Sequence, residues 1–348
     1  MGLPASVRDY TFFDYRDGFT HSRICWLCNV AGAVIQKREK EVGMLKDFLF
    51  AGLSFAIVVM IGIFAYRDIN AEWKGYQRTY NEKLAVVVKD PAIAKTPLRV
   101  TQIWNDSLNR ADRCTTCHVG IGNPAFENEK QPYKTHPDFK GYISKHPFEK
   151  VGCTVCHEGD GQALTVKATH RIVRHLDRQL RTAPAVQSAC TKCHYDLYSE
   201  SVYWPEAPML MKGISLAREL GCGACHTIRQ LGTVSTLAPE LSGIGSKTEL
   251  AFYLVHDFTK IKSHDHTFQQ WEFEHFKDPQ KIVPGTMDAK DPKDRVPPTI
   301  MPNWGLSDDE ANALTVFVMS LRDPKVEKIP RQYLPKVASH DSFFQYRN

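Results

Sequence analysis

Five Cys-x-x-Cys pairs constrain this chain more than any other feature of its sequence. They use all ten of its cysteines, and four of the five pairs are followed directly by histidine. The pairs are CTTCH from Cys114, CTVCH from Cys153, CTKCH from Cys190, CGACH from Cys222 and, without histidine, CWLCN from Cys25. A framework of five disulfides would not require a histidine after four pairs, so the pattern indicates another chemistry.

Cys-x-x-Cys-His is the attachment signal for c-type haem. Two thiols bond to the two vinyl groups of one porphyrin, and the imidazole that follows reaches the iron. Zinc ribbons, which also use Cys-x-x-Cys pairs, are the alternative. The repeated histidine favours four covalently bound c-type haems. The predicted haem-binding cysteines are Cys114, Cys117, Cys153, Cys156, Cys190, Cys193, Cys222 and Cys225. The predicted proximal iron ligands are His118, His157, His194 and His226.

Residues 48–66 contain no charged side chain and read FLFAGLSFAIVVMIGIFAY. Nineteen helical residues span about 28 Å, close to the thickness of a bilayer core. A buried helix and a cleaved signal peptide are the alternatives. The segment lies too far from the start of the chain for a signal peptide, and no small-residue cleavage site follows it. We therefore predict a single transmembrane anchor over 47–67.

The orientation of this anchor follows from the haem motifs, because Lys and Arg flank both of its ends. C-type haem is attached on the outer side of a bacterial membrane. We therefore expect a single-pass protein of the bacterial inner membrane, with 1–46 cytoplasmic and the haem domains periplasmic. Cys25 and Cys28 then lie where thiols stay reduced. A metal site with His21, a redox role and packing against a partner stay open, and we favour packing.

The spacing of the motifs divides the rest of the chain. Residues 68–105 have helical spacing and are interpreted as a helical linker. The next three motifs lie 39 and 37 residues apart, too close for separate domains, so we expect 106–205 to be a trihaem region with little regular structure. Around the fourth motif, 206–325 is predicted to be a monohaem helical domain, and 326–348 a tail. The predicted fold class is mainly α.

Two local signals mark helices in the fourth domain. A short helix is expected directly before Cys222. Ser307 and Glu310 form a Ser-x-x-Glu capping box before an apolar-periodic run, which predicts a helix from about Asp308 to Leu321.

Each low-spin haem needs a second axial ligand. Four further histidines lie in the trihaem region, and we favour His136, His146 and His170 as distal ligands over His175, without assigning any to a particular haem. The alternative for each is a surface or propionate-binding role. Because these ligands are plentiful, no iron is forced to stay open, which argues against a peroxidase or a nitrite reductase.

Residues 206–325 resemble a class I cytochrome c. The resemblance implies that Pro239 supports His226 and that Met301, in IMPNW, is the sixth ligand of the fourth haem. The sequence departs from the family in a long insertion over 256–298, which makes Met287 a rival ligand. We interpret the insertion as a solvated polar loop, His256, His264, His266 and His275 included.

Residues 106–205 resemble the multihaem cytochromes attached to bacterial quinol-oxidising cytochrome b complexes. The resemblance lies in RCTTCHVGI, HPDFK, HPFEKVGCTVCHEGDGQA and ATH. It implies a cytochrome b-type membrane subunit, a Rieske iron-sulfur protein and a soluble electron carrier as partners. Nucleic-acid binding has little support, because the net charge is +5 and the Lys and Arg residues are scattered.

We therefore expect a non-catalytic electron-transfer subunit of a quinol:cytochrome c reductase-type complex, without catalytic residues of its own. Electrons should pass from three bis-His haems to the His/Met haem, since methionine ligation raises the reduction potential. The alternatives are a stand-alone tetrahaem quinol dehydrogenase that feeds a periplasmic reductase and an enzyme with one open reactive haem.

Overall fold

The computed structural model describes residues 21–137, 139–170, 178–199, 202–263, 266–327 and 329, with 21–28 described by their backbone alone. It is mainly helical, as predicted. The chain divides into two compact units, Met1–Ala71 and Glu72–Asn348, and each is described by itself.

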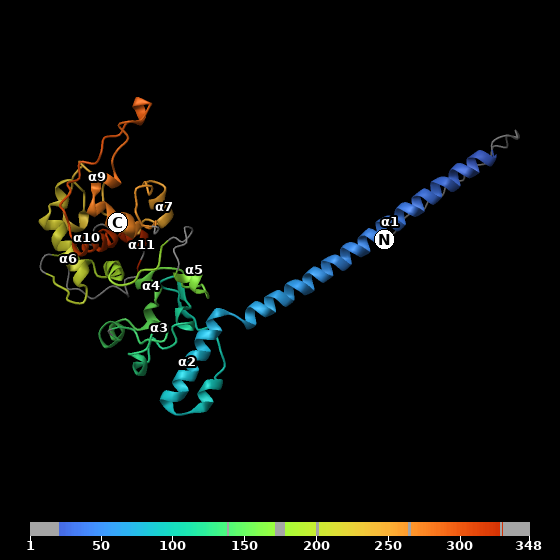
Figure 1. Ribbon diagram of the computed structural model, residues 1–348, viewed down its shortest axis with the longest axis horizontal. Coiled ribbons are helices and arrows are strands. Elements are labelled where there is room, and N and C mark those ends of the chain that lie inside the picture. Colours follow the sequence, from blue (N-terminus) through green and yellow to red (C-terminus); the bar gives the residue numbers. More distant parts are fainter. Residues whose placement is uncertain are drawn as a thin grey trace, which may run out of the picture. The chain divides into compact units, whose positions relative to one another are not determined.

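The first unit is built on one continuous helix, α1 (His21–Ile69) (Figure 1). Its most apolar 18-residue window has a mean hydropathy of 2.6 and is not buried at all. By length and composition α1 can cross a membrane, which fits an anchor or a signal sequence. The helix contains the predicted span, 47–67, and begins well before it. It carries the backbone of Cys25 and Cys28; their side chains lie outside the described residues.

The second unit starts with a separate helix, α2 (Glu72–Val88), so residues after 69 do not continue α1 as one helix. Buried residues of α2 include Trp73, Gln77 and Tyr80. The Gln77 side-chain amide donates to the Arg99 carbonyl at 2.7 Å and to the Thr116 carbonyl at 2.9 Å. The predicted linker therefore packs against the segment of the first haem motif.

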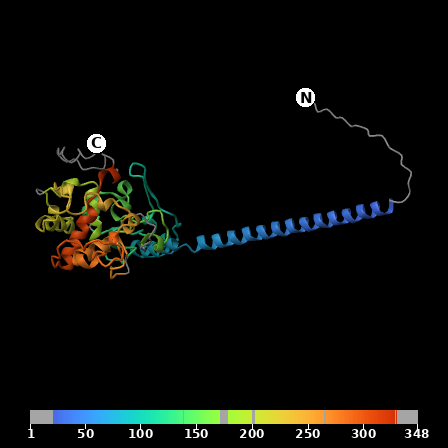
Figure 2. The same ribbon diagram turned by 90° about the horizontal axis from the view of Figure 1, so that it is seen from above.

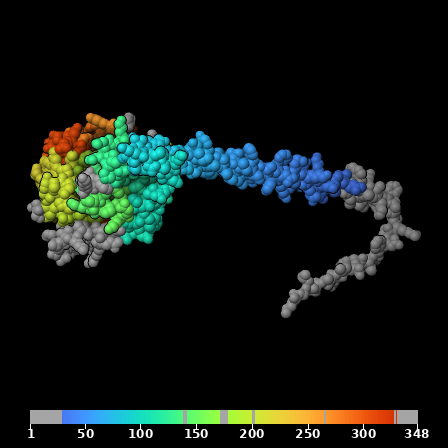
Figure 3. Space-filling model, turned by 90° about the horizontal axis from the view of Figure 1, so that it is seen from below, coloured from blue at the N-terminus to red at the C-terminus, as the bar shows by residue number. Residues whose placement is uncertain are grey.

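The trihaem region contains little regular structure, as predicted. Strands β1 (Ile103–Asn105) and β2 (Arg110–Asp112) form an antiparallel pair in which Ile103 lies opposite Asp112. The helices that follow are short: α3 (Phe148–Val151), α4 (Thr154–His157), α5 (Val166–His170) and the 3₁₀ helix η5 (Ala185–Lys192). In Figure 3 this teal and green part and the yellow-to-red C-terminal part form one continuous body.

The C-terminal part is built from helices gathered in one body (Figure 2). They are α6 (Pro208–Glu219), α7 (Glu249–Tyr253), α8 (Phe268–Lys277), α9 (Pro279–Ile282), α10 (Asp308–Ser320) and α11 (Pro324–Glu327). Helices α6 and α10 approach closely at Gly213, where a Cβ atom would lie 2.1 Å from the Ala313 carbonyl oxygen. Leu210, Ile214 and Phe317 are fully buried around this crossing.

The predicted capping box is confirmed at the start of α10. The Ser307 hydroxyl accepts from the Glu310 amide at 3.3 Å, and the Glu310 carboxylate accepts from the Ser307 amide at 2.9 Å. The expected helix before Cys222 is α6.

The insertion over 256–298 corrects the prediction of a solvated polar loop. Its helix α8 begins at the cap Thr267, whose hydroxyl accepts from the Gln270 amide at 3.2 Å. Phe268, Trp271 and Phe276 are buried, because their spacing gives this helix one apolar face. The orange loop at the top of Figure 1 does project from the body. It carries Met287, which is 58% exposed.

Candidate haem sites

The four Cys-x-x-Cys-His motifs adopt the same backbone turn. In each one, the amides of the second cysteine and of the histidine both donate to the carbonyl of the first cysteine. The two distances are 3.2 and 2.9 Å at Cys114, 3.2 and 3.0 Å at Cys153, 3.2 and 2.9 Å at Cys190, and 3.3 and 3.0 Å at Cys222. All eight thiols are free and partly buried. One shared turn with two free thiols and an adjacent imidazole fits one shared chemistry, the attachment of c-type haem.

Each of the three favoured distal histidines faces one proximal histidine. The ring centroids are 5.9 Å apart for His118 and His170, 6.2 Å for His157 and His136, and 6.1 Å for His194 and His146. A metal–imidazole bond of about 2 Å places two rings on opposite sides of one ion with their centroids about 6 Å apart. The three pairs therefore have the spacing of bis-His iron sites. His175 lies outside the described residues.

Hydrogen bonds orient several of these rings. The Nδ1 atom of His157 lies 2.9 Å from the Arg181 carbonyl, and that of His146 lies 3.1 Å from the Tyr142 carbonyl. Metal-binding histidines commonly donate their second N–H in this way, which leaves Nε2 for the metal. Burial lowers the pKa of His118 and of His194, so it favours the neutral imidazole that binds iron.

The fourth site joins His226 to the loop before α10. The Nδ1 atom of His226 lies 2.7 Å from the Pro239 carbonyl, the contact that the resemblance implied. Met301 is partly buried against the core of the domain, whereas the rival Met287 is exposed. The arrangement favours Met301 as the distal ligand.

His275 is a residue of this site that the sequence reasoning missed. Its Nε2 atom lies 3.1 Å from the Met301 sulfur, and its ring stacks on Trp271 with the centroids 4.7 Å apart. Burial lowers the pKa of His275 to about 4, and the nearby His256 and His226 act in the same direction. The available signal was the four-residue spacing of Trp271 and His275, which places both on one face of a helix.

Direct contacts join the first motif to the second. The Asp112 carboxylate, at the end of β2, accepts from the amides of Cys153 at 2.9 Å and Thr154 at 3.3 Å. Gly152 makes room for it, because a Cβ atom there would lie 2.2 Å from an Asp112 oxygen. A hydrogen bond also links the Cys114 and Cys153 thiols. The two haem-binding turns are therefore neighbours.

Further contacts join the second motif to the third, and the third to the C-terminal domain. The Lys192 ammonium donates to the Val155 carbonyl at 2.6 Å. The Thr191 hydroxyl donates to the Ser320 carbonyl at 2.8 Å, and the Tyr198 hydroxyl donates to the same carbonyl at 2.6 Å. The motifs thus follow one another in space in the order of the sequence.

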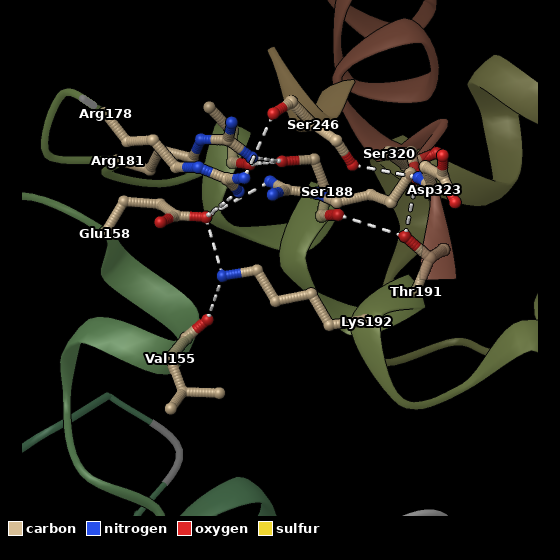
Figure 4. Close-up of polar contacts among 12 residues, drawn as sticks. Val155, Glu158, Arg178, Arg181, Ser188, Thr191, Lys192, Ser246, Ser320 and Asp323 are labelled. Carbon is tan, nitrogen blue, oxygen red and sulfur yellow. Dashed lines mark hydrogen bonds and ion pairs between the residues drawn. The ribbon is translucent and has the colours of Figure 1, made fainter. Parts of the chain in front are cut away.

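A buried group of charges lies at this last junction (Figure 4). We call it the charged joint and define it as Glu158, Arg178, Arg181, Lys192 and Arg322. Glu158 pairs with Lys192 at 2.6 Å, Arg322 at 3.2 Å and Arg178 at 3.3 Å. Burial alone would raise the pKa of Glu158, but the four cations outweigh it and hold the pKa well below its usual range. The joint ties the second and third motifs to the end of α10.

The paired helices α6 and α10, the support of His226 by Pro239 and the nearby Met301 define the C-terminal part as a c-type cytochrome. In agreement, residues 210–322 match the Cytochrome c family, within the predicted 206–325 domain. This part is therefore a cytochrome c domain, which implies covalently bound c-type haem and a general electron-transfer function. No curated protein and no solved structure matches the chain.

Proposed function

We propose that the chain is a membrane-anchored tetrahaem cytochrome c of a quinol-oxidising cytochrome b complex. In this proposal electrons pass from that complex through three bis-His haems to a His/Met haem and on to a soluble acceptor. The observation that carries the proposal is the continuous series of contacts from the first motif to the cytochrome c domain, together with the three histidine pairs.

The residues that would hold the haems are those already described. Cys114, Cys153, Cys190 and Cys222, each with the second cysteine of its motif, would bind the porphyrins. His118 with His170, His157 with His136, and His194 with His146 would ligate three irons, and His226 with Met301 the fourth. When bound, the haem irons supply one-electron transfer, and the protein supplies their positions and tunes their potentials.

The order of the motifs supports a direction of flow. The thioether of Met301 should make the fourth site the most oxidising, because Met/His ligation raises the potential relative to other axial sets. His275, which lies 3.1 Å from the Met301 sulfur, would restrict that side chain to one position. The last acceptor site in the sequence would then also be the most favourable electron acceptor.

The apolar helix α1 supports the membrane part of the proposal. We propose that it is a single-pass anchor in the bacterial inner membrane, with the N-terminus cytoplasmic and the haem-binding unit periplasmic. Its partners would be a cytochrome b-type subunit, a Rieske protein and a soluble electron carrier. The three histidine pairs argue against an enzyme with an open haem, since each proximal ring in the trihaem region has a distal partner.

The test is a pyridine haemochrome spectrum of the protein purified in mild detergent from its native membrane. We expect b-type and c-type haem in a fixed ratio. If c-type haem appears alone, and the preparation is still reduced by quinol, the chain is a stand-alone quinol dehydrogenase and the proposed complex is wrong.

A further inference from the structure

The charged joint contains more positive than negative charge. It has four cations, and the side chains of Lys192 and Arg322 are only 1% and 0% exposed. Arg178 is 18% exposed at its side chain, and Arg181 is 6% exposed. Glu158 is the one carboxylate that pairs with them in the ion pairs of the described residues.

The neighbouring carboxylates do not restore the balance. Glu249 lies within electrostatic range of Arg181, but its carboxylate accepts from the Phe268 amide at 2.9 Å. Asp323 follows Arg322 in the chain, and its carboxylate accepts from the Lys325 amide at 2.8 Å. Counting Glu158 and Glu249 against four cations leaves about two positive charges in excess in a buried place, which is costly unless an anion neutralises them.

The chemistry of the joint suits a carboxylate. Three of its cations are arginines, whose planar guanidinium groups bind carboxylates with two parallel hydrogen bonds. The hydroxyl of Ser188 lies 2.5 Å from an Arg181 nitrogen, and the Arg178 guanidinium donates to the Ser246 carbonyl at 3.2 Å (Figure 4). These contacts hold both guanidinium groups in place without neutralising their charge.

The position of the joint indicates where such an anion comes from. Glu158 directly follows the ligand His157, and Lys192 lies inside the third motif, between Cys190 and Cys193. Haem is the group that would bring carboxylates to this part of the chain, because every haem carries two propionate side chains. We propose that the charged joint is an anion site and that a haem propionate carboxylate occupies it in the loaded protein. The inference rests on the proposed function, since the haems at the second and third motifs are themselves proposed.

The experiment is infrared difference spectroscopy, reduced minus oxidised, on the full-length loaded protein in detergent. Haem is labelled with ¹³C at its carboxyl carbons through isotopic 5-aminolevulinate in the growth medium. The label separates haem carboxylates from Glu158 and from anions of the solution. We expect Arg181→Gln and Arg322→Gln each to shift a label-sensitive carboxylate band.

Arg229→Gln is the matched control. Arg229 lies in the same unit but is half-exposed and pairs at 2.9 Å with the equally exposed Glu240. It should leave the label-sensitive bands where they are in the wild type. Identical label-sensitive bands in all four proteins would overturn the proposal, and a free anion in the joint would give that same result.

Haem content, measured on the same samples, keeps the two proposals separate. Fewer than four haems per wild-type chain would refute the proposed function. Four haems with unshifted bands would refute the anion site alone. If Arg181→Gln and Arg322→Gln do not load haem, Arg178→Gln replaces them, because its side chain is the most exposed of the four cations. An experimental structure of the loaded wild type then decides: we expect a propionate oxygen within hydrogen-bond distance of a joint cation, and none there would overturn the proposal.

Discussion

Replacing Glu158 by glutamine should strongly destabilise the protein. Gln keeps the size of the side chain but removes the negative charge that pairs with Lys192, Arg322 and Arg178 at 2.6, 3.2 and 3.3 Å. The carboxylate and two of these cations are no more than 1% exposed, so water does not replace the lost partner. Removing one member of a buried ion pair costs about 3–5 kcal/mol in the free energy of unfolding.

The effect should be measured by guanidinium-induced unfolding of the full-length loaded protein, followed through its haem absorbance. Glu240→Gln is the control, because it breaks a half-exposed pair with Arg229 and should cost less than about 1 kcal/mol. For a unit of this size, a loss of 3–5 kcal/mol corresponds to a fall in melting temperature of roughly 6–20 °C. If both variants lose the same free energy of unfolding, the charged joint does not stabilise the contact between the trihaem region and the cytochrome c domain.

Three further perturbations test other parts of the structure. Gly213→Val should cost at least about 1–3 kcal/mol, measured by thermal melting, because its Cβ would lie 2.1 Å from the Ala313 carbonyl; a melting temperature equal to the wild type would show that α6 and α10 do not cross there. Burial raises the pKa of Glu272 from 4.5 to about 8. The unfolded chain therefore releases this proton at a lower pH than the folded protein, and stability should fall as the pH rises from about 4.5 to 8. Glu272→Gln should remove this loss and exceed the wild type by at most about 5 kcal/mol at pH 8, measured by unfolding at both ends of the window; parallel pH profiles would contradict the assignment. His275→Phe should weaken the optical band that arises from sulfur–iron charge transfer and shift the potential of the fourth haem alone; an unchanged band and potential would mean that His275 does not position Met301.

The haem-binding parts were predictable because their signals are local. Cys-x-x-Cys-His needs only five consecutive residues, and the capping box of Ser307 and Glu310 needs four. The distal set His136, His146 and His170 followed from counting ligands within one region. Their pairing did not, because His146 faces His194 across a stretch of irregular chain for which no periodicity fixes the path.

The charged joint and His275 were not predictable for a different reason. Charged and polar residues are usually exposed, so Glu158, Lys192 and Arg322 read as surface positions until the fold brings them together. The insertion that contains His275 looks polar as a whole. Its few apolar residues, among them Trp271 and Phe276, lie on one helical face, and only packing on α10 shows which side is buried.

The central claim is that all four motifs carry haem, and the intact mass of the purified chain tests it most directly. The account predicts a mass equal to that of the polypeptide plus four covalently bound haems. A mass with a single haem would confine haem binding to the cytochrome c domain. It would leave the three histidine pairs without the irons that the account assigns to them.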